Sequence, residues 1–250
     1  MKKKGLIGVA LLLFALQSSG VQAADKVVVI PLNSCNDPNL VPENICLGVT
    51  ICGVTGTSAN CVPTVTLAGQ VWMDRNLGAT RVATSSTDTE AYGDLYQWGR
   101  LADGHEKRTS TTTSTLSTSD VPGHGDFITS PASPYDWRSP QNNNLWQGVS
   151  GINNPCPAGF RLPTDTEWET ERLSWSRNDS AGAFASPLKL VVAGCRGHSD
   201  GTILGAGSYG FYWSSTVNGA ASRYLIFFSS SANMNNINRA YGFSVRCLED

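Results

Sequence analysis

The sequence predicts an α+β protein in which small antiparallel sheets and one or two helices support long loops. One stretch, 164–175, carries a clear helix start. Short runs of alternating apolar residues at 211–215, 223–228 and 242–247 predict a meander of three strands near the C-terminus. The segment 120–153 is rich in Pro and Asn and carries turn chemistry throughout. Few helices, short strands and long irregular segments together favour the α+β class.

The predicted helix begins at about Asp165. Thr164 and Glu167 have the spacing of a capping box, in which each side chain bonds the backbone N–H of the other residue. Acidic residues in the first turns suit the positive end of the helix dipole. Trp168 and Trp175 fall on one face, which we expect to be buried. The segment 156–163 before it should be extended, because Pro163 disfavours helix in the residue that precedes it.

The N-terminus has the pattern of a secretory signal peptide, residues 1–23. Three lysines precede an apolar run at 6–16, and the small-x-small sequence 21–23 predicts cleavage before Ala24. The run is shorter than the roughly 20 residues that span a bilayer. We therefore expect a secreted or bacterial cell-surface protein with no transmembrane segment after the signal is removed.

The net charge of the exported chain argues against a nucleic-acid partner. The sequence has 18 basic residues, of which three lie in the signal peptide, against 20 acidic residues. The mature chain is therefore acidic, and it lacks the positive charge that attracts phosphate backbones.

Residues 24–63 are expected to form a short Cys-rich spacer of strands and turns before the main domain at 64–250. A strand is predicted at 27–30, and 44–57 alternates β-branched residues with glycine. A unit of this size cannot bury a large core, so disulfides are expected to stabilise it. Four cysteines can pair in three ways, and all three remain open for Cys35, Cys46, Cys52 and Cys61.

Three cysteines lie in the main domain. We predict a disulfide between Cys156 and Cys247, because it would join the lead-in of the helix to the last strand. This disulfide would close a loop of about 90 residues, which should stabilise the domain by roughly 4 kcal/mol. Cys195 is then left over, and we expect it to be a buried, unreactive side chain.

Other strands of the main domain follow from local patterns. Residues 65–68 and 69–73 predict two strands joined at a turn, and 188–193 predicts another strand. Within 223–228, Leu225 and Phe227 point to one side and the alternate residues to the other, so one side must be core. The polar, Asn-rich segment 229–239 should lie in solvent between the second and third strands of the meander.

Four sequence blocks resemble the Fibrobacter succinogenes major paralogous domain family of secreted bacterial domains. They are 74–79, 91–100 with 103–105, 156–168, and 212–215 leading to 242–247, so the resemblance covers about residues 64–250. Residues 161–168 are also similar to formylglycine-generating enzymes, relatives of the C-type lectin fold. This second similarity implies a C-type lectin-like fold, in which long loops pack over small twisted antiparallel sheets.

The residues do not predict an enzyme. The three histidines lie in different loops, and Gly194–His198 with Asp200 falls short of the four ligands of a zinc site. We expect the His of Asp103-Gly104-His105 to bond locally within a turn. The resemblance to formylglycine-generating enzymes implies copper held by two C-terminal cysteines, and only Cys247 stands in that region. A divergent enzyme of that type is the alternative, and a purely structural surface component is a third reading.

No cofactor is predicted. The lectin resemblance implies calcium at sugar sites built on Glu-Pro-Asn or Gln-Pro-Asp, followed by Trp-Asn-Asp. Here Trp213-Ser214-Ser215 replaces the last motif, and residues 202–241 contain no carboxylate. Calcium generally needs carboxylate ligands. Calcium is therefore not supported at the C-terminal loops, and it is left open elsewhere.

The C-terminal region has the composition of a binding surface. Tyr, Ser, Asn and Arg are typical of recognition loops. The region is similar to the variable region of lectin-fold proteins that retroelements diversify. We predict adhesion or recognition of a surface glycan, polysaccharide or protein, against the alternative of a solvated hairpin with no ligand. The predicted ligand-binding residues are Trp213, Asn218, Arg223, Tyr224, Ser229, Ser231, Asn233, Asn235, Asn236, Asn238, Arg239 and Tyr241.

Overall fold

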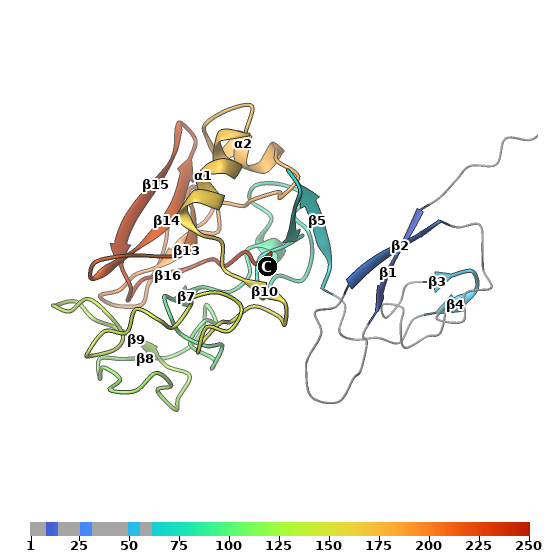
Figure 1. Cartoon of the computed structure of the whole chain (residues 1–250). Coiled ribbons are helices and arrows are strands. Elements are labelled where there is room, and N and C mark those ends of the chain that lie inside the picture. The colour runs from blue at the N-terminus through green and yellow to red at the C-terminus, as the bar shows by residue number, and fades with distance from the viewer. Residues whose placement is uncertain (1–8, 15–25, 32–49, 56–61) are drawn as a thin grey trace, which may run out of the picture. The chain divides into compact units, whose positions relative to one another are not determined.

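The computed structural model describes residues 9–14, 26–31, 50–55 and 62–250, and the chain divides into two compact units, 1–62 and 63–250 (Figure 1). In the first unit, β1 (Val9–Phe14) pairs antiparallel with β2 (Lys26–Pro31), and β3 (Thr50–Ile51) with β4 (Val54–Thr55). β2 contains the strand predicted at 27–30, and β1 lies within the predicted signal peptide. Cys52 is disulfide-bonded. The other three early cysteines lie outside the described residues.

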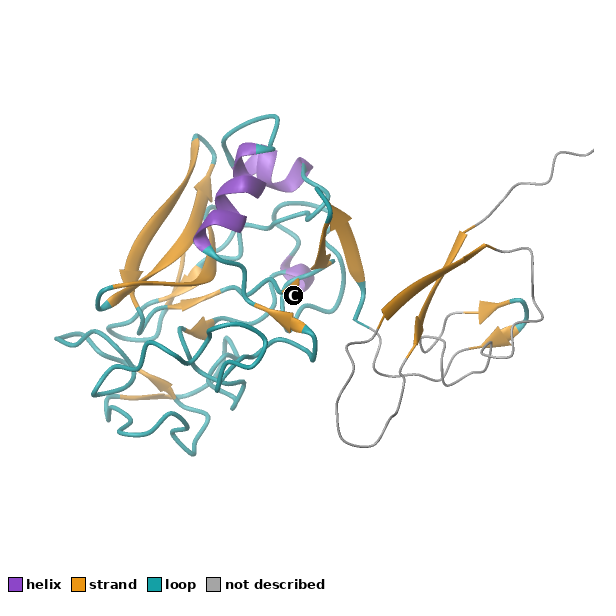
Figure 2. Ribbon diagram, viewed as in Figure 1, coloured by secondary structure: helices purple, strands orange, loops and turns teal. Residues whose placement is uncertain are grey.

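The second unit is α+β and consists mainly of small antiparallel sheets (Figure 2). Two sheets have the strand orders β10-β17-β6-β5 and β12-β11-β16-β7, a third is β13-β14-β15, and β8 pairs parallel with β9. No helix in the described ranges is both long and apolar enough to cross a membrane. The elements are β5 (Thr64–Leu67), β6 (Gln70–Met73), the 3-10 helix η2 (Thr89–Ala91), β7 (Tyr96–Gln97), β8 (Thr112–Thr113), β9 (Phe127–Ile128), β10 (Phe160–Arg161), α1 (Asp165–Leu173), α2 (Ser180–Ala185), β11 (Cys195–Arg196), β12 (Ile203–Leu204), β13 (Gly210–Asn218), β14 (Ala221–Phe228), β15 (Ser231–Asn238), β16 (Gly242–Phe243) and β17 (Leu248–Glu249).

The helix α1 begins as the sequence predicts. Thr164 Oγ1 accepts a bond of 3.2 Å from the backbone N–H of Glu167, whose carboxylate accepts one of 2.7 Å from the N–H of Thr164. Arg161 donates two bonds to the same carboxylate, at 2.7 and 2.9 Å. Trp168 is fully buried, and its indole N–H donates to the carbonyl oxygen of Trp213 at 3.0 Å. The helix start is therefore tied to the sheet that follows it.

The main core lies between the helices and one face of the β13–β15 sheet. Trp168 packs against Trp72 of β6 and Tyr212 of β13, at ring-centroid distances of 5.1 and 5.7 Å. Leu225 and Phe227 belong to the same buried cluster, so their side of β14 faces the core. The sequence predicted that one of the two sides of this strand is core, without deciding which. We call this side of the sheet the helix face and the opposite side the outer face.

The two ends of the second unit meet. β17 pairs with β6, and a disulfide joins Cys156 to Cys247, as predicted. Cys195 is a buried free thiol, and burial raises its pKa to about 11. The hairpin of β5 and β6 also agrees with the sequence, because Ala68 and Gly69 both have positive φ and form its two-residue turn.

The strand predicted at 188–193 is wrong. The segment is buried but irregular, and its backbone bonds go to loops, to helix α2 and to several side chains instead of a neighbouring strand. The N–H of Val192 donates to Ser86 O at 2.9 Å, and the N–H of Val191 donates to the hydroxyl of Tyr212 at 2.9 Å. The residues 188–193 are apolar because they are buried. Their backbone partners are not the successive residues of one neighbouring strand, so no β-ladder forms.

The third strand of the meander is also misplaced in the prediction. β15, not 242–247, completes the sheet, and β16 pairs with β7 and β11 in a different sheet. The turn at Ser229 and Ser230 returns the chain at once, so β15 pairs with β14 from Ser231 to Asn238 without a break in register. Ala232 and Met234 point into the core side, which the overall polarity of the segment concealed.

Several motif residues form a buried polar frame. The Arg246 guanidinium donates to Asn76 Oδ1 at 2.9 Å and to Leu188 O at 2.8 Å, and Asn76 donates to Tyr92 O. Arg100 is fully buried and donates to Asp103 and to backbone oxygens. A buried cation is stable only when its donors are paired. The motif blocks therefore position loops in this chain.

Candidate functional site

The outer face of the β13–β15 sheet combines aromatic and amide side chains in register. Phe211 pairs with Ile226, and Ile226 pairs with Asn233. Residues directly opposite in neighbouring strands have side chains on the same face, so these three form one row. The rows on either side follow from the same register, with Phe228 opposite Ser231, and with Trp213, Tyr224 and Asn235 in line.

Part of this face is covered and part is open. Phe243 of β16 stacks on Trp213 and Phe211, with ring centroids 4.3 and 5.0 Å apart, and packs at a tilt against Tyr224 at 5.0 Å. Beyond this cover, Tyr209 is 40% exposed and packs against Phe211 and Phe228, with centroids 6.0 and 5.3 Å apart. The open part, which we call the aromatic patch, consists of Tyr209, Phe211, Ile226, Phe228, Ser231 and Asn233.

The aromatic patch carries no charged side chain. Its polar groups are the hydroxyls of Tyr209 and Ser231 and the amide of Asn233. An amide both donates and accepts hydrogen bonds, and aromatic rings supply rigid contact area. Partly exposed rings beside neutral polar groups suit a neutral ligand with apolar and hydroxylated faces.

The structure scatters the twelve predicted residues. Ser229, Ser231, Asn233 and Asn235 lie on the outer face or on the turn beside it. Asn218 lies at the turn that closes the opposite end of the β13–β14 hairpin. Tyr241 packs beside His198 at 4.6 Å. The others lie on the helix face, at the end of β15, or in the interior, and they are Trp213, Arg223, Tyr224, Asn236, Asn238 and Arg239.

Three of the predicted binding residues are buried, which corrects the prediction. Trp213 is 0%, Arg239 1% and Tyr224 5% exposed. The indole N–H of Trp213 donates to Tyr96 O at 2.7 Å, and Tyr224 lies under Phe243. The guanidinium of Arg239 lies 4.4 Å from the Trp98 ring. Trp, Arg and Tyr are common in binding sites, but in this protein these three side chains fill buried space between the sheets and loops.

Two further predicted residues belong to the helix face. Arg223 forms an ion pair with Asp165 at the start of α1, with Nε 2.9 Å from the carboxylate oxygen. Asn236 lies opposite Arg223 in the register and is exposed. They therefore point away from Asn233, and one ligand on the aromatic patch would not reach them.

The prediction missed the aromatic members of the patch. The predicted set was chosen for the polar side-chain types of binding loops in the region that follows Trp213, and it does not contain Tyr209, Phe211 or Phe228. One signal was present in the sequence. The alternation in 223–228 places apolar residues on both sides of the strand, which requires a second cover or an open apolar surface.

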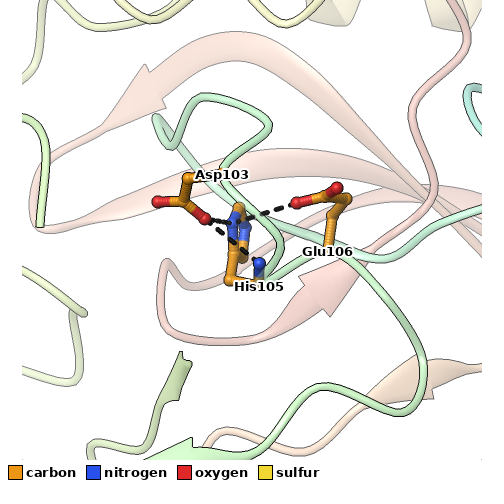
Figure 3. Close-up of side chains that lie close together, drawn as sticks. All are labelled: Asp103, His105 and Glu106. Carbon is orange, nitrogen blue, oxygen red and sulfur yellow. Dashed lines mark hydrogen bonds and ion pairs between the residues drawn. The ribbon is translucent and has the colours of Figure 1, made fainter. Parts of the chain in front are cut away.

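A second cluster, Asp103, His105 and Glu106, groups three residue types that hold metals (Figure 3). His105 Nε2 accepts a bond of 3.0 Å from the backbone N–H of Gln97. In a neutral imidazole the other nitrogen then carries the proton, and Nδ1 donates it to Asp103 at 2.7 Å. Neither nitrogen offers a free lone pair to a metal. The cluster is a hydrogen-bonded turn, as predicted for Asp103-Gly104-His105.

The neutral state of His105 has a measurable consequence. Burial lowers its pKa to about 4 from 6.5, more than the bond to Asp103 raises it. The unfolded chain binds this proton below pH 6.5 and the folded protein does not, so folding stability is lost as pH falls from 6.5 towards 4. We expect a loss on the order of 3 kcal/mol. Denaturant unfolding at several pH values should show a flatter profile for His105→Gln, and parallel profiles would contradict this.

In the sequence pattern Gly194–His198 with Asp200, His198 and Asp200 both have local partners. His198 Nδ1 lies 2.9 Å from Ser130 O, and its ring packs between Tyr135 and Tyr241. Asp200 accepts bonds from Thr202. Among the residues 62–250, these two side chains form no group of three metal-ligand types with Cys195. Cys247 is bonded to Cys156, so its sulfur is not available as a thiolate ligand.

Comparisons with known proteins add no relative. A scan against protein-family models, a search of curated proteins and a search of solved structures each found no match.

Proposed function

We propose that this chain is an exported recognition protein that binds a neutral glycan or polysaccharide on the aromatic patch, without catalysis. The observation that carries the proposal is the row Phe211, Ile226 and Asn233 beside the exposed ring of Tyr209. The apolar face of a sugar ring packs on an aromatic side chain, and its hydroxyls match an amide that donates and accepts. An export signal at 1–23 would bring the patch to surface polysaccharides.

We also propose that residues 64–250 form a C-type lectin-like domain of the Fibrobacter succinogenes major paralogous family. The four motif blocks support this, together with the small antiparallel sheets and the long irregular segments between β7 and β10. The proposed ligand site does not use calcium, because the patch and residues 202–241 hold no carboxylate.

Binding to a glycan array and to purified surface polysaccharides tests this function. The variant Tyr209→Ala/Asn233→Ala removes an exposed ring and the amide of the patch, and we expect its Kd to rise at least tenfold, which corresponds to about 1.4 kcal/mol. Its free energy of unfolding should stay within about 1 kcal/mol, since both side chains are exposed.

Asn236→Ala is the matched control. It changes the same residue type on the same strand, but on the helix face, and its Kd should equal that of the unaltered protein. Equal weakening in the control, or unchanged binding in the double variant, would refute a site on the aromatic patch.

A further inference from the structure

β15 is an edge strand: among residues 62–250, no strand pairs with its second side, and only its first part next to the turn, at the buried Ala232, is covered by Arg172 of α1. It is the last strand in the order β13-β14-β15 and lies at the outer margin of its unit (Figure 1). It has eight residues, more than the usual five or six. Asn233, Asn235 and Asn236 along it are exposed. The backbone of such a strand can pair on one side only, unless something covers the other.

The register shows which backbone groups point outward. The turn at 229–230 makes Phe228 and Ser231 a hydrogen-bonded pair, so alternate residues from Ser231 bond to β14. Ala232, Met234, Asn236 and Asn238 then point away from the sheet. The few bonds recorded on this side agree, because Arg172 donates to Ala232 O, the N–H of Tyr241 to Asn238 O, and the N–H of Asn236 to Asn235 Oδ1.

The middle of this edge is unpaired. Within residues 62–250, the N–H and C=O of Met234 and the C=O of Asn236 have no hydrogen-bond partner. The N–H of Asn236 bonds only to the neighbouring side-chain oxygen, at 2.8 Å. These groups are arranged to extend the ladder by one more strand.

The strand also lacks the features that prevent pairing. Natural edge strands are protected by charged residues, proline, bulges, short length, or a helix or loop that covers the edge. Here Arg172 of α1 covers the edge at Ala232 only, and Asn235 and Asn236 are exposed. The sequence of β15, Ser-Ala-Asn-Met-Asn-Asn-Ile-Asn, has no charge and no proline, and its pairing with β14 has no bulge. An unprotected edge of this length in a stable domain indicates a partner strand.

The side chains favour an identical strand as that partner. Asparagine amides donate and accept equally, so rows of them match themselves, and an uncharged strand brings no like charges together. We propose that β15 pairs antiparallel with β15 of a second copy, on a two-fold axis at Asn235. Met234 then exchanges backbone bonds with Asn236 of the second copy, and the two Asn235 side chains face each other on the outer face.

This dimer has one continuous six-stranded sheet. It would place the two aromatic patches on the same side of that sheet, although the inference does not rest on the proposed ligand. Two-fold pairing of the same surface is the commonest arrangement of homo-oligomers.

The molar mass of the purified protein in solution, measured by sedimentation over a range of concentrations, tests the dimer. We expect about twice the monomer mass at the highest concentrations. Asn236→Pro deletes an N–H on the unpaired side of β15, where its partner within the chain is the side-chain oxygen of Asn235. Edge strands tolerate proline at such a position, and the variant should halve the mass. Asn233→Ala should leave the dimer intact. A monomer at every concentration, or a dimer that persists in a folded Asn236→Pro variant, would overturn the proposal.

Cross-linking tests the register. In Asn235→Cys the two thiols face each other in a non-hydrogen-bonded pair, where Cβ atoms lie about 4.5–5.5 Å apart, so the native protein should oxidise to a covalent dimer. In Asn233→Cys each thiol faces Ile237 of the second copy, and we expect little cross-linking. Equal cross-linking in both variants would rule out the two-fold axis at Asn235.

Discussion

Replacing Arg239 by Met should lower the free energy of unfolding by about 3–5 kcal/mol. Arg239 directly follows β15, and its Nη1 is 3.9 Å from the carboxylate of Asp136, which is buried as well. It also donates to Asn143 Oδ1 at 2.7 Å and to Gly219 O at 3.1 Å. Met fills similar volume but leaves a buried carboxylate without a cation and these acceptors without a donor. Urea denaturation at pH 7 measures the loss.

The pH dependence of that loss separates the charge from the packing. Burial raises the pKa of Asp136 to about 6, against the opposing effect of Arg239. The folded protein therefore holds the proton of the Asp136 carboxyl group more tightly than the unfolded chain does. As pH rises from about 4 through 6, the unfolded chain loses this proton first, so the free energy of unfolding falls. At pH 5 the carboxyl is largely protonated, so the Arg239→Met variant should lose less stability than at pH 7.

Arg223→Met is the matched control for this experiment. Its ion pair with Asp165 is partly exposed, with 25% and 29% of the two side chains accessible, and such pairs contribute about 0–1 kcal/mol. A comparable loss in both variants, or a loss from Arg239→Met that does not change with pH, would show that the Asp136 charge is not the cause.

Removing the disulfide should have an effect of similar size. Cys156 and Cys247 are 91 residues apart in the sequence, and opening a loop of that length is expected to cost about 4 kcal/mol in the chain-entropy picture. For a domain of this size the Tm should fall by roughly 10 °C in the Cys156→Ser/Cys247→Ser variant. Scanning calorimetry measures this fall, and binding at low temperature should persist, because the aromatic patch is not touched.

Cys195→Ala provides the reference for a cysteine that is buried but unpaired. We expect it to change stability by about 1 kcal/mol, the central value for a point substitution. If the double variant lost no more than Cys195→Ala, the bridge would not contribute to the stability of the domain.

Local features of the fold could be predicted and distant ones could not. The start of α1 depends on Thr164 and Glu167, which are three residues apart, and the β5–β6 hairpin depends on its turn, so both predictions are correct. The segment 188–193 has the composition of a strand, but strand formation depends on which backbone lies beside it. That neighbour is a loop residue, Ser86.

The candidate site shows the same limit. Residue type alone favoured Trp213, Tyr224 and Arg239 for binding, and all three are buried because β16 and the Trp98 region cover them. Asn233 and Asn235 were predicted and are exposed, whereas Tyr209 and Phe211 became candidates only when their open end was seen. Alternation identifies two faces of a strand, but not which one is covered.

The sequence by itself determined where the helix α1 and the β5–β6 hairpin begin, that Cys195 is left without a partner when Cys156 pairs with Cys247, and that part of the Asn-rich segment 229–239 is exposed. The tertiary structure decided that this segment is a strand with a free edge, and which aromatic rings beside it remain open. The physical reason is the sequence distance over which each effect acts. Helix caps, turns and polarity depend on residues a few positions apart, whereas the burial of a strand face or edge depends on elements that are distant in the chain.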